Sequence, residues 1–148
     1  MDLKTQINES VKDAMRTGDE VRKRTLRMVL AAVKQAEVDK QTTLDDMAVV
    51  SILQKEVKNR REALEEANKA GRADLASDNT AEIAVLEVFL PQAMPVEELR
   101  ALAQAAIAET GAASMSDMGK VMKVLMPRVA GRAPNDMIST VVRESLQK

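Results

Sequence analysis

The sequence predicts an all-α protein, and three observations lead to that prediction. Apolar residues make up 45% of the 148-residue chain, which is enough for packed cores, and Phe89 is its one aromatic residue. The core must therefore come from Leu, Val, Ile, Met and Ala, most of which are good helix formers. Five glycines and four prolines are too few to supply the turns of an all-β fold.

The first two helices are expected over about residues 3–16 and about residues 20–38, because apolar residues recur there at helical spacing. Gly18-Asp19 between them provides a stop and a new N-terminal cap. The second helix contains Leu26–Val33, a run that is apolar on nearly all sides. This run predicts the most buried helix of the first half of the chain.

A third helix is expected over about residues 44–70, after a candidate cap at Thr42-Thr43 and before Gly71 in the usual C-terminal glycine position. A fourth helix follows and reaches about Leu90, where Pro91–Pro95 forms the best linker in the sequence. We therefore expect a four-helix domain over residues 1–90.

Three further helices predict a second, smaller domain over residues 91–148. They are expected over about residues 95–109, 117–126 and 134–147. Ser114 and Ser116 are candidate caps for the middle helix, and Pro127 is expected to break it.

Charge is unevenly spread along the chain, although the net charge is only −1. Residues 1–61 carry +3, residues 62–117 carry −8, and residues 118–148 carry +4. Such asymmetry is typical of a protein with charged partners. The sequence contains no histidine and no cysteine, which excludes thiolate nucleophiles, histidine bases and the usual zinc sites. Neighbouring acids such as Asp45-Asp46 point about 100° apart on a helix, so they do not converge on one metal. We expect no metal site, no catalytic residue and no cofactor.

The basic segment after residue 117 holds the candidate binding residues. Met118, Val121, Met122 and Leu125 share one apolar face, which indicates core packing, with a methionine-rich binding groove as the alternative. Lys120 and Lys123 lie on the opposite face. Gly119 beside them indicates a close approach, either by another helix or by the backbone of a ligand.

Arg128 and Arg132 are expected on the turn before the last helix. Guanidinium groups beside a helix N-terminus suit a phosphate, although charge alone equally fits a solvated surface. In the first domain, Lys55, Lys58, Arg60 and Arg61 resemble a basic patch, but three of them lie four residues from acids, in the pairs Glu56–Arg60, Lys58–Glu62 and Arg61–Glu65. This spacing favours a salt-bridged exposed helix over a binding patch. Arg27 is either half-buried against a carboxylate or turned toward a partner.

Three stretches resemble one family along essentially the whole chain. They are Thr25–Met28, Leu86–Pro91, and the run from Asp117 through Met126-Pro127 to Gly131–Ala133. In these stretches the chain resembles the stand-alone YqeY proteins of the GatB/YqeY family. The region from about residue 91 also resembles the tail domain of the B subunit of glutamine-dependent aspartyl/glutamyl-tRNA amidotransferase.

The resemblance implies a tail that helps to hold tRNA without doing chemistry. It makes Lys120, Arg128 and Arg132 candidate RNA contacts, and Lys123 joins them from its place on the helix face. Two departures affect this reading. Phe89 replaces the family's usual tyrosine and so lacks its hydroxyl, and Pro134-Asn135 replaces the usual Asp-Gly.

Three functions remain open from the sequence. The first is a cytoplasmic, non-catalytic protein that binds tRNA or another structured RNA and has no contact with membranes. The second is an adaptor whose first domain docks on a partner protein, which the strongly acidic middle of the chain favours. The third is a carbon–nitrogen ligase that uses glutamine as amide donor, and it rests on the resemblance alone.

Overall fold

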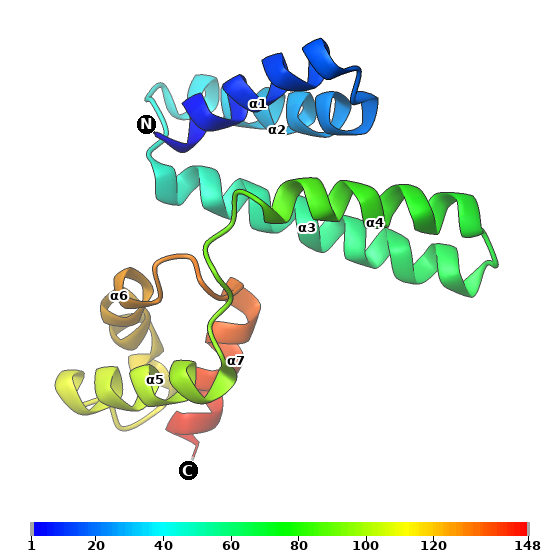
Figure 1. Cartoon of the computed structure of the whole chain (residues 1–148). Helices are drawn as coiled ribbons and strands as arrows, with labels where there is room; N and C mark the ends of the chain where they lie inside the picture. Colours follow the sequence, from blue (N-terminus) through cyan, green and yellow to red (C-terminus); the bar gives the residue numbers. More distant parts are fainter. Residues whose placement is uncertain (1, 148) are drawn as a thin grey trace. The chain divides into compact units, whose positions relative to one another are not determined.

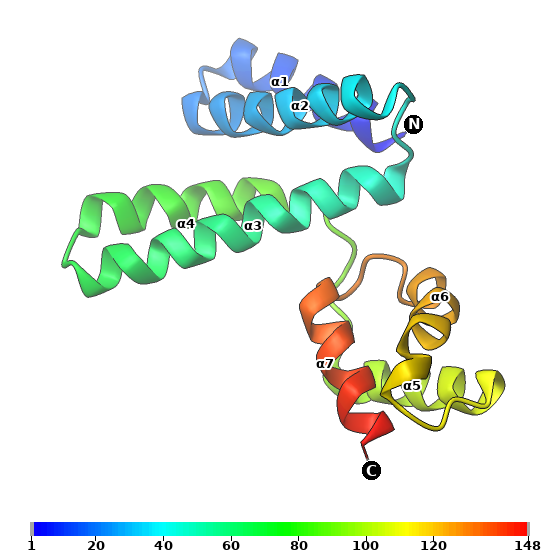
Figure 2. The ribbon, with the colours of Figure 1, turned by 180° about the vertical axis from the view of Figure 1, so that it is seen from behind.

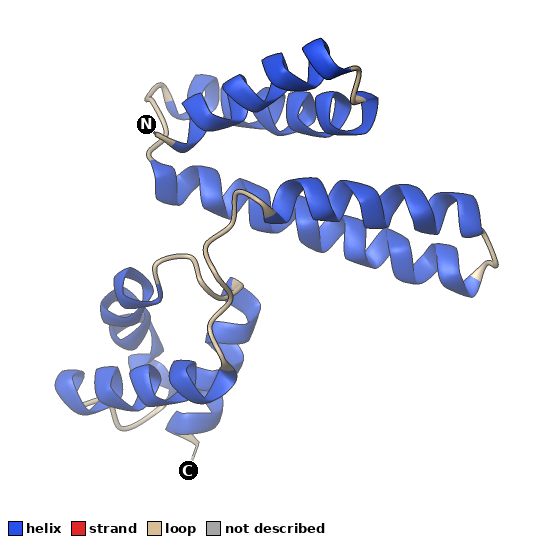
Figure 3. Cartoon of the chain, viewed as in Figure 1, coloured by secondary structure: helices blue, strands red, loops and turns tan. Residues whose placement is uncertain are grey.

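A computed structural model gives the structure of the protein and describes residues 2–147. Helices account for all regular structure in this range, with loops between them and no strand (Figure 3). This confirms the predicted all-α class. The chain divides into two compact units, one ending at Leu90 and the other beginning at Pro91. These are called the first and the second unit below.

The first unit starts with an antiparallel hairpin of α1 (Leu3–Thr17) and α2 (Glu20–Lys40), which lie side by side in Figures 1 and 2. Gly18 ends α1 in the left-handed region with φ of 76°, which an L-residue with a side chain adopts at a cost. The side chain of Asp19 then accepts a hydrogen bond from the amide of Arg22 and caps α2. The predicted stop and cap are confirmed.

The second hairpin of this unit pairs α3 (Asp46–Lys69) with α4 (Ala73–Glu87) through a turn at Gly71 (Figure 1). The cap predicted at Thr42-Thr43 is wrong. Asp45 caps α3 instead, accepting a hydrogen bond at 2.9 Å from the amide nitrogen of Ala48, the third residue of the helix. A carboxylate at this position also suits the positive end of the helix dipole.

The core of the first unit lies between the two hairpins. Its largest completely buried side chains come from all four helices: Ile7, Leu26, Val29, Val33, Val49, Leu53 and Leu86. The prediction that α2 would be the most buried helix of the first half is wrong. α2 has four buried residues and α3 has six. One face of α2 enters the core, whereas Met28, outside that face, is 52% exposed.

The second unit contains α5 (Val96–Thr110), a short 3₁₀ turn η1 (Met115–Asp117), α6 (Met118–Val129) and α7 (Asn135–Leu146) (Figure 2). Its core is built from small and branched side chains of the three α-helices and the loop after α6, including Leu99, Ala103, Ala106, Val121, Leu125, Val129, Ala133, Ile138 and Val142.

The predicted break at Pro127 is wrong, because α6 continues through this proline to Val129. A proline ring is compatible with helical φ, but it removes one N–H donor and crowds the carbonyl four residues earlier. Pro127 lies in the last turn on an exposed face, where water can satisfy the carbonyl left without a partner. The helix ends only where Ala130 and Gly131 both take positive φ.

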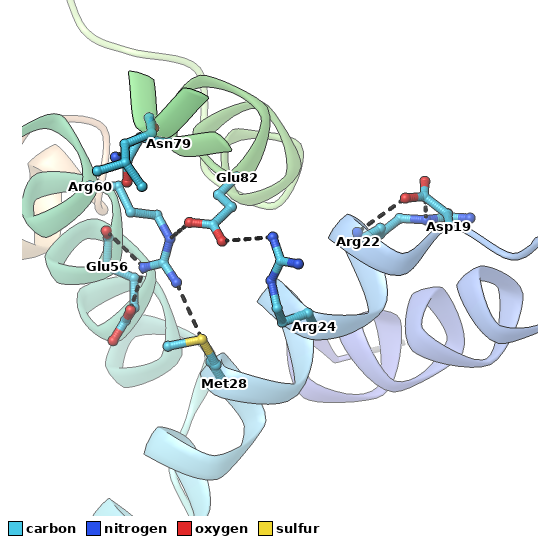
Figure 4. A network of polar contacts seen from close by, with 9 residues as sticks. Asp19, Arg22, Arg24, Met28, Glu56, Arg60, Asn79 and Glu82 are labelled. Carbon is cyan, nitrogen blue, oxygen red and sulfur yellow. Dashed lines mark hydrogen bonds and ion pairs between the residues drawn. The ribbon is translucent and has the colours of Figure 1, made fainter. Parts of the chain in front are cut away.

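A buried arginine joins three helices of the first unit (Figure 4). Arg60 of α3 is buried and pairs with Glu56 one turn earlier, as the i, i+4 spacing predicts. Its Nε also donates to Glu82 of α4 at 3.0 Å, and the same carboxylate accepts from Arg24 of α2 at 3.2 Å. The expectation of a wholly exposed basic helix is thus wrong at Arg60.

The predicted partner of Arg61 is also wrong. Arg61 reaches Glu87 of α4 at 2.7 Å rather than Glu65 on its own helix. Glu65 instead pairs with Lys69. The carboxylates of α4 therefore draw two arginines of α3 across the hairpin.

We predict that Leu26→Ala lowers the free energy of unfolding by roughly 2–5 kcal/mol, because it leaves a cavity in the core. Leu30→Ala should cost clearly less, since Leu30 is only partly buried against that core. Urea melts of the two variants measure the difference. Equal losses would contradict the assigned orientation of α2.

We predict that Glu82→Gln lowers the free energy of unfolding by about 2–3 kcal/mol, because a buried guanidinium loses one of its two carboxylates. Glu65→Gln is the matched control. Glu65 and its partner Lys69 are both exposed, so this substitution should cost less than about 0.5 kcal/mol. Denaturant melts that rank the two variants equally would show that the Arg60 network does not hold the helices together.

Candidate nucleic-acid interface

The basic helix α6 has one buried and one exposed side. Val121 and Leu125 are completely buried, and Met118 and Met122 pack against them while partly buried. This confirms core packing rather than a methionine groove. On the opposite side lie the residues that we call the α6 face, all exposed: Gly119, Lys120, Lys123 and Pro127.

Gly119 stands in open space. Apart from its chain neighbours and the adjacent backbone of α6, no heavy atom lies within 4 Å of the position that a Cβ would occupy, so the predicted close approach of another helix is wrong. Its φ is also outside the positive range that favours glycine. Neither packing nor backbone conformation therefore requires glycine here. The remaining alternative, approach of a ligand backbone, stays a prediction.

The two lysines of the α6 face are available to an anion. Lys120 has a distant ion pair, with its Nζ 3.9 Å from Asp117, and its side chain is 73% exposed. Such an exposed pair contributes little free energy. Lys123 is exposed and has no ion pair with any residue that the structure describes. Both ammonium groups can thus exchange their present surroundings for a phosphate at little cost.

Asp117 occupies the N-cap position of α6, so the predicted serine caps are wrong. Ser114 and Ser116 hydrogen-bond to each other at 2.7 Å rather than to the helix. Asp117 directs its Oδ2 backward to the amide of Ala113 at 3.0 Å, and this bond lowers the pKa of Asp117. No side chain caps the first amides of α6, but the ionised carboxylate beside them opposes an anion close to the helix end.

Pro127 adds an acceptor to the α6 face. A proline has no N–H, so the carbonyl of Lys123, four residues earlier, receives no helical hydrogen bond from it. The α6 face therefore combines two cations and an open glycine with a carbonyl that lacks its usual helical donor. Sequence reasoning read Pro127 as a helix stop and missed this role, although the spacing of four residues contained the signal.

Arg128 does not join the α6 face. Its Nη2 pairs with Glu109 of α5, and both side chains are partly exposed. The pair links α6 to α5 within the second unit.

Arg132 fastens the start of the second unit. Its Nε donates to the carbonyl of Gln92 at 3.1 Å, and its Nη1 lies 3.1 Å from Glu98 of α5. The backbone amide of Met94 also donates to the Arg132 carbonyl at 2.8 Å. The structure thus separates the four predicted contacts: Lys120 and Lys123 share one face, whereas the two arginines engage carboxylates.

The two departures from the family pattern have different surroundings. Phe89 packs, partly buried, against the core of the first unit. Pro134 occupies the N-cap position of α7 with extended backbone, and no side chain caps that helix. With Pro134-Asn135 in place of the usual Asp-Gly, α7 still begins as a regular helix at Asn135.

The described residues form neither a metal site nor a membrane-spanning helix. Within residues 2–147, no three His, Cys, Asp or Glu side chains gather as a metal site requires. Among the same residues, no helix combines the length and apolarity needed to cross a membrane.

The sequence is similar to one protein family and to several fungal proteins. The model of the YqeY family, described as Yqey-like protein, matches residues 4–146. A protein of Eremothecium gossypii named "Altered inheritance of mitochondria protein 41, mitochondrial" is 34% identical over 73% of the chain, which spans 61% of that protein.

Two further relatives differ in coverage. A protein of Pyrenophora tritici-repentis with the same name is 27% identical over 94% of the chain and 78% of its own length. An uncharacterised protein of Schizosaccharomyces pombe is 30% identical over 61% of the chain and 73% of its own length.

We predict that Arg132→Ala exposes the linker to proteases, because three side-chain hydrogen bonds that fasten residues 92–98 are lost. Thermolysin should cleave between Leu90 and Val96 at least about threefold faster than in the parent. Arg143→Ala, an exposed arginine of α7, is the control and should leave the rate unchanged. Equal rates for both variants would contradict the fastening role.

Proposed function

The chain belongs to the family of YqeY-like proteins, and we propose that it is a non-catalytic, tRNA-directed accessory protein that binds structured RNA. The α6 face is the contact surface in this proposal. Lys120 and Lys123 neutralise phosphates, Gly119 lets the RNA backbone come close, and the Lys123 carbonyl accepts a hydrogen bond from a ribose hydroxyl.

One observation carries the proposal: the exposed side of α6 holds two lysines without strong partners around a glycine that nothing in the protein requires. The region from residue 118 onward also carries +4 on a chain whose net charge is −1. Such a surface attracts a polyanion without reading its bases. Selectivity then comes from the shape of a folded RNA, because Phe89 is the one aromatic ring and is packed in the first unit.

Arg128 and Arg132 take a supporting place in this proposal. Each must leave a carboxylate before it can bind phosphate, so their first role is to set the position of α6 and the loop after it. They become direct contacts only if RNA displaces Glu109 and Glu98.

The absence of catalysis in the proposal rests on the residues available. A chain without histidine and cysteine lacks the commonest bases and nucleophiles. The resemblance to the amidotransferase tail also concerns a part that holds tRNA rather than one that reacts. Glutamine-dependent amide transfer that tracks one residue of this chain would favour the ligase alternative.

The proposal places the protein in the cytoplasm, whereas the fungal relatives named above include proteins called mitochondrial. Cell fractionation with an antibody against the intact protein tests this part. Recovery with organelles would reject it.

We predict that Lys120→Ala/Lys123→Ala weakens binding of bulk tRNA about tenfold near 0.1 M salt and makes the log–log salt slope shallower by about 2. Both side chains are exposed, so the thermal melt should not change. Fluorescence anisotropy at several salt concentrations measures both effects.

The control is Lys12→Ala/Lys69→Ala, which removes the same charge from exposed positions of the first unit. It should bind like the parent. If the α6 variant keeps the parent affinity and slope, RNA binding by this face is wrong. Arg128→Ala/Arg132→Ala should instead lower the melting temperature.

A further inference from the structure

The outer face of α2 carries an exposed line of residues at i, i+4, i+7 and i+11. We call the line and its neighbour Met28 the α2 stripe: Arg27, Met28, Ala31, Lys34 and Val38. The line itself lies opposite the buried face formed by Leu26, Val29 and Val33. Met28 lies at the edge of the stripe toward α3, where its sulfur accepts a hydrogen bond from Nη2 of Arg60 at 3.7 Å (Figure 4). The core of the first unit is complete without the stripe.

The stripe and its surroundings contain large apolar side chains that are exposed to solvent. Met28 is 52% exposed and Val38 is 62% exposed, and Met15 of α1, against which Arg27 lies, is 56% exposed. Methionine side chains adapt their shape to a partner because they are unbranched and polarisable. Exposed apolar side chains beside unpaired cations on one helix are typical of a protein contact.

The arginine of the stripe has no carboxylate partner, unlike the other described arginines of the first unit. Six arginines of the first unit bind carboxylates: Arg16, Arg22, Arg24, Arg60, Arg61 and Arg72. Arg27 is the exception among the described arginines there, and it donates only to the sulfur of Met15 at 3.5 Å. The carboxylate partner that the sequence allowed for it is absent from the described structure. Lys34 likewise has no ion pair with a described residue.

We propose that the α2 stripe docks an acidic amphipathic helix of a partner protein. Arg27 and Lys34 are seven residues, or two turns, apart, which corresponds to about 10 Å along the helix axis. A helix packed alongside must present two carboxylates at the same spacing, with leucine-like residues between them to cover Met28 and Ala31. The small side chain of Ala31 lets the two helices approach closely.

Other occupants fit this surface less well. A second copy of the chain would bring Arg27 and Lys34 against the same cations across a two-fold axis, and like charges repel. Nucleic acid would bury Met28 and Val38 against phosphates, and the stripe has no aromatic ring on which a base could stack. The proposal is independent of RNA binding by the α6 face.

The test uses two synthetic helical peptides that place leucines on one face and differ at two flanking positions seven residues apart, glutamate in one and glutamine in the other. The intact protein should bind the glutamate peptide at least about tenfold more tightly than the glutamine peptide. Arg27→Glu/Lys34→Glu should remove this preference and leave the circular-dichroism melt unchanged, because both side chains are exposed. Lys55→Glu, at an exposed position of α3, is the control and should keep it.

A third peptide with lysine at the two positions supplies a charge swap. It should bind the reversed variant better than the parent. Met28→Ser/Val38→Ser should weaken the glutamate peptide without changing the salt dependence of its binding.

Equal affinity for the glutamate and glutamine peptides would overturn the proposal. The same conclusion follows if Arg27→Glu/Lys34→Glu instead abolishes binding of bulk tRNA, of vesicles with anionic lipids, or of a second copy in sedimentation experiments.

Discussion

The first unit depends on how one buried cation is surrounded. A guanidinium inside a protein is costly unless carboxylates meet it, and Arg60 meets Glu56 on its own helix and Glu82 on α4 (Figure 4). Because Glu82 also accepts from Arg24, the same carboxylate links α2 to this network. The network agrees with the rotation of α2 that places Leu26 and Val33 in the core and leaves the α2 stripe facing outward.

The second unit uses arginines for a similar purpose at its edges. Arg132 holds Gln92 and Glu98, and Arg128 holds Glu109, so both fasten segments to α5. The lysines of α6 remain available to bind an anion, because their ammonium groups extend from the exposed side of a helix whose apolar side is already buried. Within one short basic region, arginine therefore supports the fold and lysine supplies the available charge.

The sequence predicts the helices well, because their signals are local. Gly18 and Asp19 end one helix and start the next through their own backbone and side-chain preferences, and these are readable in isolation. The cap at Asp45 and the passage of α6 through Pro127 are not predicted. At the start of α3, threonine is a good cap, but Asp45 lies next to the first residue of the helix. At Pro127, proline usually ends a helix, but in an exposed last turn water can satisfy the carbonyl that loses its hydrogen bond.

The candidate sites are predicted less completely, because they depend on partners that are distant in sequence. Arg61 and Glu65 have ideal spacing on one helix, yet Glu87 of α4 takes Arg61. Glu98 and Arg132 are 34 residues apart, and no pattern in the sequence joins them. Sequence analysis therefore finds the basic residues of the second unit but does not separate fastening arginines from free lysines.

The most direct test of RNA binding by the α6 face is a titration of the isotopically labelled protein with tRNA, followed through its backbone amide NMR signals. The proposal predicts that the largest changes occur at Gly119, Lys120 and Lys123 and that raised salt reverses them. Changes confined to residues of the first unit, or no change at a tRNA concentration that saturates the anisotropy signal, would contradict it.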